Sequence, residues 1–143
     1  MKVYTYNDKV LTNSANGKWL KEKEVPVFVM DASNAQYYNT GSSWTYLYWE
    51  GPDFPNGYDG GSKQCVIVNN NSTSSQNLMY TNDSIAGGPT AINGSDLVTG
   101  TTTMLANQAG AASGYGKYLC VPFNSEEDAR AWVANVTITI VDP

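Results

Sequence analysis

The strongest constraint on the fold is a two-residue periodicity that recurs in two segments of the sequence. In "NVTITIVD", Val136, Ile138 and Ile140 alternate with threonines. In "SSWTYLYWEG", positions 44, 46 and 48 form one face and positions 45, 47 and 49 form the other. Because successive side chains of a strand point to opposite faces of its sheet, both segments are predicted to be β-strands.

The residues between such segments favour turns. The chain has 143 residues, the length of one ordinary domain, and contains 15 Asn and 13 Gly but only 15% charged residues. Asn and Gly accept positive φ angles, and Ser and Thr bond their own backbone, so this composition favours strands and turns over helices. About eight strands separated by turn signals predict an all-β fold, a two-sheet β-sandwich that is jelly-roll-like.

The other expected strands are short and are separated by loops rich in Gly, Pro, Asn and Ser. They lie in "KVYTY", "KVLT", "KWLKEKE", "VPVFVMD", "CVIVNNN", "NLMYTND", "TGTTTML" and "GKYLCVPF".

One segment, "SEEDARAWV", predicts a short helix before the last strand. Ser125 suits the N-cap position, and Asp128 is the acidic residue three positions later. Glu126 and Glu127 suit the positive end of the helix dipole. Because an isolated helix of this length is not stable, we expect Trp132 to pack it onto the sheet.

The first 24 residues differ in charge from the rest of the chain. Residues 1–24 hold five lysines and three acidic residues, a net charge of +2, whereas residues 25–143 hold three basic and ten acidic residues, a net charge of −7. The dipeptides Asn7-Asp8 and Asn16-Gly17 predict two tight hairpins, which together would form a short β-meander. We therefore divide the chain into an N-terminal β-hairpin anchoring segment, 1–24, and a β-sandwich domain, 25–143.

Such a small sheet cannot bury its own apolar side chains, so the segment must pack on the body or on another chain. Both alternatives remain open: the segment completes the sheet of the body, or it anchors the protein to a partner. In the second case the expected contact residues are Tyr4, Tyr6, Trp19 and Leu20, with Lys18 and Lys21 at the rim.

Several classes of function are disfavoured. The chain has no histidine, which removes Ser-His-Asp and Cys-His nucleophile systems and the commonest metal ligand. The net charge of −5 argues against binding to nucleic acid. No apolar run has the length of a signal peptide or a membrane helix, so we expect synthesis in a cytoplasm and no membrane partner. Cys65 and Cys120 lie in apolar strands and are expected as buried thiols, with a disulfide only if those strands are neighbours.

The cluster of acidic residues after the strand at 44–49 allows four interpretations. Glu50, Asp53 and Asp59 lie among aromatic residues, as in a glycosidase with paired carboxylates or in a sugar-binding face. Asp53, Asn56 and Asp59 could instead ligate calcium, although Pro55 breaks the EF-hand spacing. The fourth interpretation, which we favour, is that the aromatic residues form core and the acids are solvated. We expect no catalytic residues, no metal and no cofactor.

If the region does contact a glycan or another partner, its aromatic and acidic residues are the candidates. They are Trp44, Trp49, Glu50, Asp53, Phe54 and Tyr58. Because both faces of the strand carry tryptophan and tyrosine, which are enriched at interfaces, association is favoured over chemistry.

The pattern as a whole resembles virion structural proteins of tailed bacteriophages, especially capsid-decoration, head-fibre and tail-fibre modules. The resemblance lies in the leader "MKVYTYNDKVLTNSANGKWLKE", followed by an Asn/Gly/Ser/Thr/Tyr-rich β-domain that ends in "VTITIVDP". It implies a non-enzymatic virion protein with capsid or tail proteins as partners and a trimeric or other homo-oligomeric state. The N-terminal segment would anchor it, and the β-domain would project outward. The alternative function is a carbohydrate-binding β-sandwich that contacts host surface glycans through residues 44–58.

Overall fold

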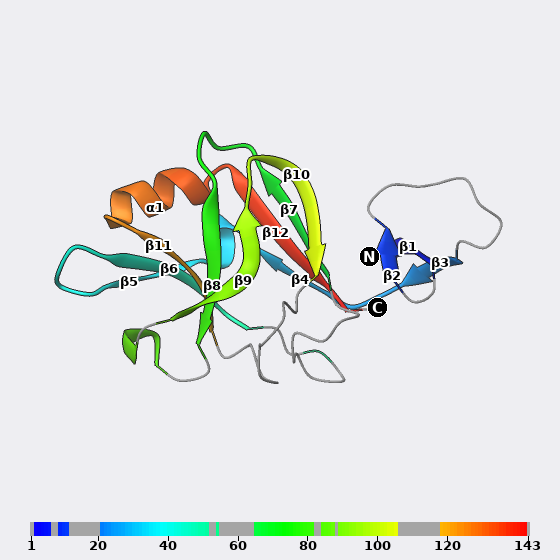
Figure 1. Cartoon of the computed structure of the whole chain (residues 1–143), viewed down its shortest axis with the longest axis horizontal. Coiled ribbons are helices and arrows are strands. Elements are labelled where there is room, and N and C mark those ends of the chain that lie inside the picture. The colour runs from blue at the N-terminus through cyan, green and yellow to red at the C-terminus, as the bar shows by residue number, and fades with distance from the viewer. Residues whose placement is uncertain are drawn as a thin grey trace.

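The computed structural model describes residues 2–6, 9–11, 21–51, 54, 65–81, 84–87, 89–105 and 118–142. For the described residues before Glu24, and for 65, 90–96 and 104–105, only the backbone is described. These residues form three antiparallel sheets and one α-helix (Figure 1).

The body consists of a four-stranded and a five-stranded antiparallel sheet. The four-stranded sheet has the order β10-β7-β12-β4 and the five-stranded sheet the order β5-β6-β11-β8-β9. The first contains β4 (Val27–Met30), β7 (Cys65–Asn70), β10 (Gly100–Leu105) and β12 (Val136–Val141). The second contains β5 (Gln36–Asn39), β6 (Thr45–Glu50), β8 (Gln76–Thr81), β9 (Thr90–Leu97) and β11 (Tyr118–Phe123). The predicted all-β, sandwich-like fold is confirmed.

The body has more strands than the sequence predicts. Strands were expected in the segments that form β4, β6, β7, β8, β10, β11 and β12, and the structure places a strand in each. It adds β5 and β9, whose sequences QYYN and TAINGSDL lack clear apolar alternation. Pairing with β6 and β8 makes these two segments extended, so neighbouring strands rather than local pattern decide their structure.

The predicted helix is confirmed as α1 (Glu126–Val133), and Ser125 is its N-cap. The Ser125 Oγ accepts a hydrogen bond of 3.1 Å from the Asp128 backbone N–H. Ala129, Trp132 and Val133 are buried against the body, as the short length of the helix requires. Two 3-10 helices, η1 (Ala32–Asn34) and η2 (Ile85–Gly87), lie in the loops.

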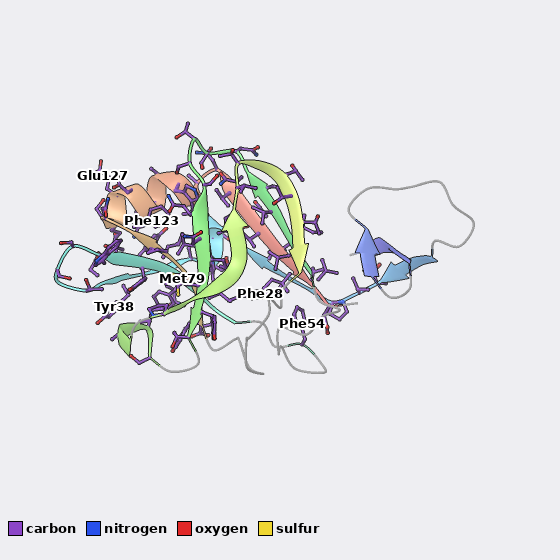
Figure 2. All side chains as sticks on the ribbon, in the orientation of Figure 1. Phe28, Tyr38, Phe54, Met79, Phe123 and Glu127 are labelled. Carbon is purple, nitrogen blue, oxygen red and sulfur yellow. The ribbon has the colours of Figure 1, made fainter. Side chains whose placement is uncertain are left out.

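The core lies between the two body sheets. The predicted alternation determines which side chains of β6 and β12 are buried in it. In β6, Thr45, Leu47 and Trp49 are buried while Tyr46 and Tyr48 are half-buried. In β12, Val136, Ile138 and Ile140 point into the same core cluster. Figure 2 shows Phe28 and Phe123 on opposite parts of the body, and Phe28 packs at the margin of this core.

The N-terminal strands form a separate sheet. They are β1 (Lys2–Tyr6), β2 (Lys9–Leu11) and β3 (Lys21–Glu24), in the order β2-β1-β3. The first predicted hairpin is confirmed, since β1 and β2 pair antiparallel with Tyr6 opposite Lys9. Figure 1 shows this sheet apart from the sandwich, beyond the first residue of β4.

The predicted β-meander is wrong, because β3 pairs with β1 rather than with β2. The observed register aligns Lys2 with Glu24 across the two strands. Opposite charges facing each other on neighbouring strands stabilise a sheet, which gives a physical reason for this pairing.

Candidate functional site

The residues predicted to contact a glycan differ in their exposure to solvent. Trp44 is 51% exposed, and Glu50 is exposed at the end of β6. Trp49 is 1% exposed and Phe54 is also buried, so neither can reach a ligand in the folded chain. The Trp49 Nε1 donates a hydrogen bond of 3.0 Å to the Asp31 carbonyl oxygen, which fixes the indole in the core.

The structure does not describe the side chains of the remaining predicted contact residues. Asp53 and Tyr58 lie outside the described residues, as do Asn56 and Asp59 of the calcium alternative. Of the predicted anchor residues, Tyr4 and Tyr6 lie in β1 and Lys21 lies in β3, each with backbone described only. Lys18, Trp19 and Leu20 lie outside the described part of the chain.

Trp44 lines a cavity of about 620 Å³ at one end of the sandwich. Three chain segments and one helix meet there: the turn before β6, the β7–β8 loop, the end of β11, and α1. The volume lies within the range of roughly 300–1,000 Å³ that is usual for small-molecule sites. The lining combines Trp44 and Trp132 with hydroxyl, amide and carboxyl groups.

A short turn holds Trp44 at the rim of this cavity. Thr40 donates twice to the Trp44 carbonyl oxygen, from its backbone N–H at 3.0 Å and from its Oγ1 at 2.9 Å. Gly41 in this turn has φ of 81°, a conformation that glycine adopts without strain. The backbone of Trp44 is therefore fixed while its indole stays exposed to solvent.

Asn70 holds the β7–β8 loop that forms another wall. Its buried amide donates to the carbonyl oxygens of Ser74 and Leu97, both at 2.9 Å. Its Oδ1 accepts from the backbone N–H of Ser72 at 3.0 Å and from the Ser72 Oγ. The Trp132 Nε1 also donates to the Ser74 carbonyl at 2.9 Å, which ties the loop to α1. These bonds make the wall rigid before any ligand binds.

Three side-chain amides and one carboxylate in the described part of the lining are free to bind a ligand. Among the described residues, the side chains of Asn71, Asn124, Asp128 and Asn135 make no hydrogen bond, although all four are exposed and line the cavity. Each amide offers one acceptor and two donor hydrogens, and an ionised carboxylate accepts hydrogen bonds. No lysine or arginine is found among the described lining residues.

The arginine of α1 is held away from the cavity by its own partners. The Arg130 Nε donates to Glu126 Oε2 at 2.9 Å, and the guanidinium lies 4.1 Å from the centre of the Tyr37 ring. Asn39 also donates to Glu126, at 3.1 Å. The hydrogen bond from Arg130, followed by that from Asn39, lowers the pKa of the Glu126 carboxyl. Asp128 is thus the only charged residue among the described residues that line the cavity.

A second hollow, of about 440 Å³, adjoins the first. Its lining includes Asp31, Ser33 and Thr137, and it shares Asn71 and Asn135 with the first cavity. The Asn71 backbone N–H donates to the Asn135 carbonyl oxygen at 2.9 Å, so these two shared residues form a fixed pair.

The outer face of the five-stranded sheet carries the remaining aromatic residues of β6. Tyr48 meets Tyr118 of β11 edge-on with ring centres 5.6 Å apart, and its hydroxyl donates to Gln36 Oε1 at 3.1 Å. Cys120 of β11 lies directly opposite Tyr48 in the sheet register and is a buried free thiol, so it does not pair with Cys65. Burial raises the pKa of the Cys120 thiol from 9.0 to about 12, which keeps it protonated and unreactive at neutral pH.

Two features that would indicate other kinds of site are missing from the described residues. No three His, Cys, Asp or Glu side chains in that part of the chain gather as metal ligands. None of the described helices is both long and apolar enough to cross a lipid bilayer.

Most residues of the cavity were missed by sequence reasoning. Only Trp44 of the lining was predicted as a contact residue. Asp128 was assigned to the helix, Asn71 and Asn135 to the ends of predicted strands, and Asn124 to no element. The local signal was weak, because Asn is abundant throughout the chain and nothing in the sequence indicates that these four positions share one hollow.

Comparison of the chain with protein-family models, with curated proteins and with solved structures finds no match.

Proposed function

We propose that this protein is a non-enzymatic structural component of a phage virion. Residues 1–24 join it to the particle, and the sandwich of residues 25–143 projects as a capsid decoration or as part of a fibre. The observation that carries the proposal is the sheet order β2-β1-β3: among the described strands, none of these three pairs with a strand of the body. A three-stranded sheet this short needs another surface to cover one of its faces, and a neighbouring virion protein would supply it.

The path of the chain through the body supports the same proposal. From β4 onward the chain enters the five-stranded sheet with β5 and β6, returns with β7, crosses with β8 and β9, and returns with β10. It then crosses once more with β11 and ends in β12 of the first sheet. Such repeated crossing is typical of jelly rolls, an architecture that recurs in viral capsid and lectin domains.

The test is a variant that lacks residues 1–24. We expect it to keep the circular dichroism spectrum and cooperative unfolding of the sandwich but to be absent from phage particles purified from cells that express it. The full-length chain, expressed in the same way, should be found in the particles by mass spectrometry. Full-length chain missing from the particles, or truncated chain retained in them, would overturn the proposal.

A second candidate function is carbohydrate binding, now at the Trp44 cavity. The observation that favours it is an exposed indole beside three amides and one carboxylate whose side chains are free of hydrogen bonds within the described chain. A sugar ring offers an apolar C–H face, which stacks on an aromatic ring, and hydroxyl groups that match amide and carboxylate partners. Many copies on one particle would raise a weak affinity to useful avidity.

Tryptophan fluorescence tests this second candidate. Polysaccharide purified from the host surface should change the emission of the wild-type protein, since Trp44 is the most exposed tryptophan described, and Trp44→Phe should abolish that change. An equal change in the variant, or none in the wild type, would contradict carbohydrate binding at this cavity.

A further inference from the structure

We infer that the two adjoining hollows form one elongated site with two subsites, which binds a neutral oligosaccharide segment rather than a single or an acidic sugar. The inference rests on the second candidate function and deepens it. The proposed ligand runs from Trp44, past the pair Asn71 and Asn135, to Asp31 and Thr137.

The continuity of the site follows from its shared residues. Asn71 and Asn135 line both hollows, and both are exposed. Their backbones are joined by the hydrogen bond of 2.9 Å, which leaves both side-chain amides free to turn toward either side. A ligand longer than one hollow would therefore meet these amides at its middle.

The two subsites differ in chemistry. The first holds the exposed Trp44 indole, so it can stack the apolar face of a ring. The described lining of the second holds no aromatic side chain and offers hydroxyl and carboxyl groups instead. There Asp31 Oδ1 accepts the Ser33 backbone N–H at 2.9 Å, while no described residue donates to Oδ2, which can accept from a ligand hydroxyl. Stacking at one end and hydrogen bonding at the other suit a chain of linked sugar rings.

The charge of the site selects against acidic ligands. Among the described residues, the linings of the two hollows contain Asp31 and Asp128 and no basic residue. The whole chain carries a net charge of −5. A uronate or sialate carboxyl would be repelled there and would find no cation to pair with. A neutral sugar meets no such cost, so we assign a neutral ligand.

The size of the site determines how affinity should depend on the length of the oligosaccharide. At about 620 Å³ and about 440 Å³, each hollow lies within the usual range for small-molecule sites of roughly 300–1,000 Å³. Each can therefore hold at least one sugar ring. Affinity should rise with the number of sugar units until both hollows are filled, and then stay constant.

Isothermal titration calorimetry with two ligand series tests the inference. One series consists of neutral gluco-, galacto- and manno-oligosaccharides of one to six units, and the other of uronate oligomers of matched length. The proteins are the wild type, Trp44→Ala, Thr137→Val and the control Val98→Ala, which changes an exposed apolar residue outside both linings. Circular dichroism confirms that each variant is folded.

The expected result separates the two subsites. Trp44→Ala should weaken binding of all lengths by at least about tenfold, because the stacking partner is lost from the first subsite. Thr137→Val should leave the shortest ligands unaffected and weaken the longer ones by about three- to tenfold, the usual range for one lost hydrogen bond. Val98→Ala should bind as the wild type does, and uronate oligomers should bind more weakly than neutral ones.

Two kinds of failure can be told apart. If affinity does not depend on length and Thr137→Val has no effect, or if uronate oligomers bind better, the elongated neutral site is wrong while carbohydrate binding at Trp44 stands. If no ligand of either series binds and host polysaccharide also leaves the fluorescence unchanged, the second candidate function fails and this inference fails with it.

Discussion

Trp44 and Trp49 are five positions apart, but one side chain is exposed to solvent and the other is buried in the core. Trp49 lies inside β6 on the core face, 1% exposed, with its indole N–H bonded to the Asp31 carbonyl. Trp44 lies just before the first residue of β6, and its side chain is 51% exposed. The first is a structural residue, and the second is available for binding.

We predict opposite effects of truncating these two tryptophans. Trp49→Ala should lower the free energy of unfolding by about 3–5 kcal/mol, because it leaves a large cavity in the core. Trp44→Ala should change it by less than about 0.5 kcal/mol, as expected for an exposed site. Urea denaturation followed by circular dichroism measures both. A loss of several kcal/mol in Trp44→Ala would show that its indole supports the fold rather than a ligand.

Cys120 gives a prediction about pH. Its thiol has a pKa of about 12 in the folded chain and an ordinary value of 9.0 once exposed by unfolding. The unfolded state thus loses this proton first, so the stabilising contribution is complete below pH 9 and decreases as the pH rises from about 9 toward 12.

The urea midpoint should therefore fall more steeply between pH 8.5 and 10.5 in the wild type than in Cys120→Ala. The comparison removes the contributions of lysines and tyrosines, which both proteins share. Equal slopes would mean that the thiol is not protected from solvent. Mass spectrometry after iodoacetamide treatment at pH 8 should also find Cys120 unmodified until urea unfolds the chain.

At the scale of elements, α1 is held by contacts at both of its ends. Its first turn has the Ser125 cap, and Glu126 links the helix to Asn39 of β5. Toward its other end, Trp132 is buried and bonded to Ser74. The helix therefore joins β5 to the β7–β8 loop, and its residues Asp128, Ala131 and Trp132 line the Trp44 cavity.

Removing the cap should weaken the helix measurably. Ser125→Ala is expected to lower the free energy of unfolding by about 1 kcal/mol, because the Asp128 N–H loses its partner. Ser125→Asp, which keeps an acceptor and adds favourable charge at the helix N-terminus, should match the wild type. Thermal unfolding measures both, and equal losses in the two variants would mean that the hydroxyl acts through a contact other than the cap.

At the scale of the whole molecule, the last strand occupies the middle of the four-stranded sheet. β12 pairs with β7 on one side and β4 on the other, and three of its side chains enter the core. The chain cannot complete this sheet until its final residues are present. The N-terminal sheet has no such role among the described strands, because it pairs only within itself.

Truncation at the two ends should consequently have unequal effects. A chain that ends at residue 135 should fail to fold, with a disordered circular dichroism spectrum and no cooperative transition. A chain that starts at residue 25 should fold. If the first variant folds, β12 is not needed to join β4 to β7; if the second does not, residues 1–24 complete the body after all.

Local pattern predicted the parts of the fold that depend on one strand or one turn. The alternation in β6 and β12, the Ser125 cap and the antiparallel pairing of β1 with β2 were all confirmed, because each depends on residues close in sequence. The pairing of β3 with β1, and the extended structure of β5 and β9, could not be predicted, since each depends on a partner that sequence does not identify.

The candidate site also separates what local sequence can predict from what depends on tertiary packing. The sequence by itself determined that the chain is mostly β, that one face of β6 and of β12 is buried, and that a capped helix precedes the last strand. Only the tertiary structure decided that Trp49 and Phe54 are core while Trp44 lines a hollow. The reason is that alternation specifies which side chains share a face, whereas the packing of two sheets and a helix specifies which faces meet and which loops enclose a cavity.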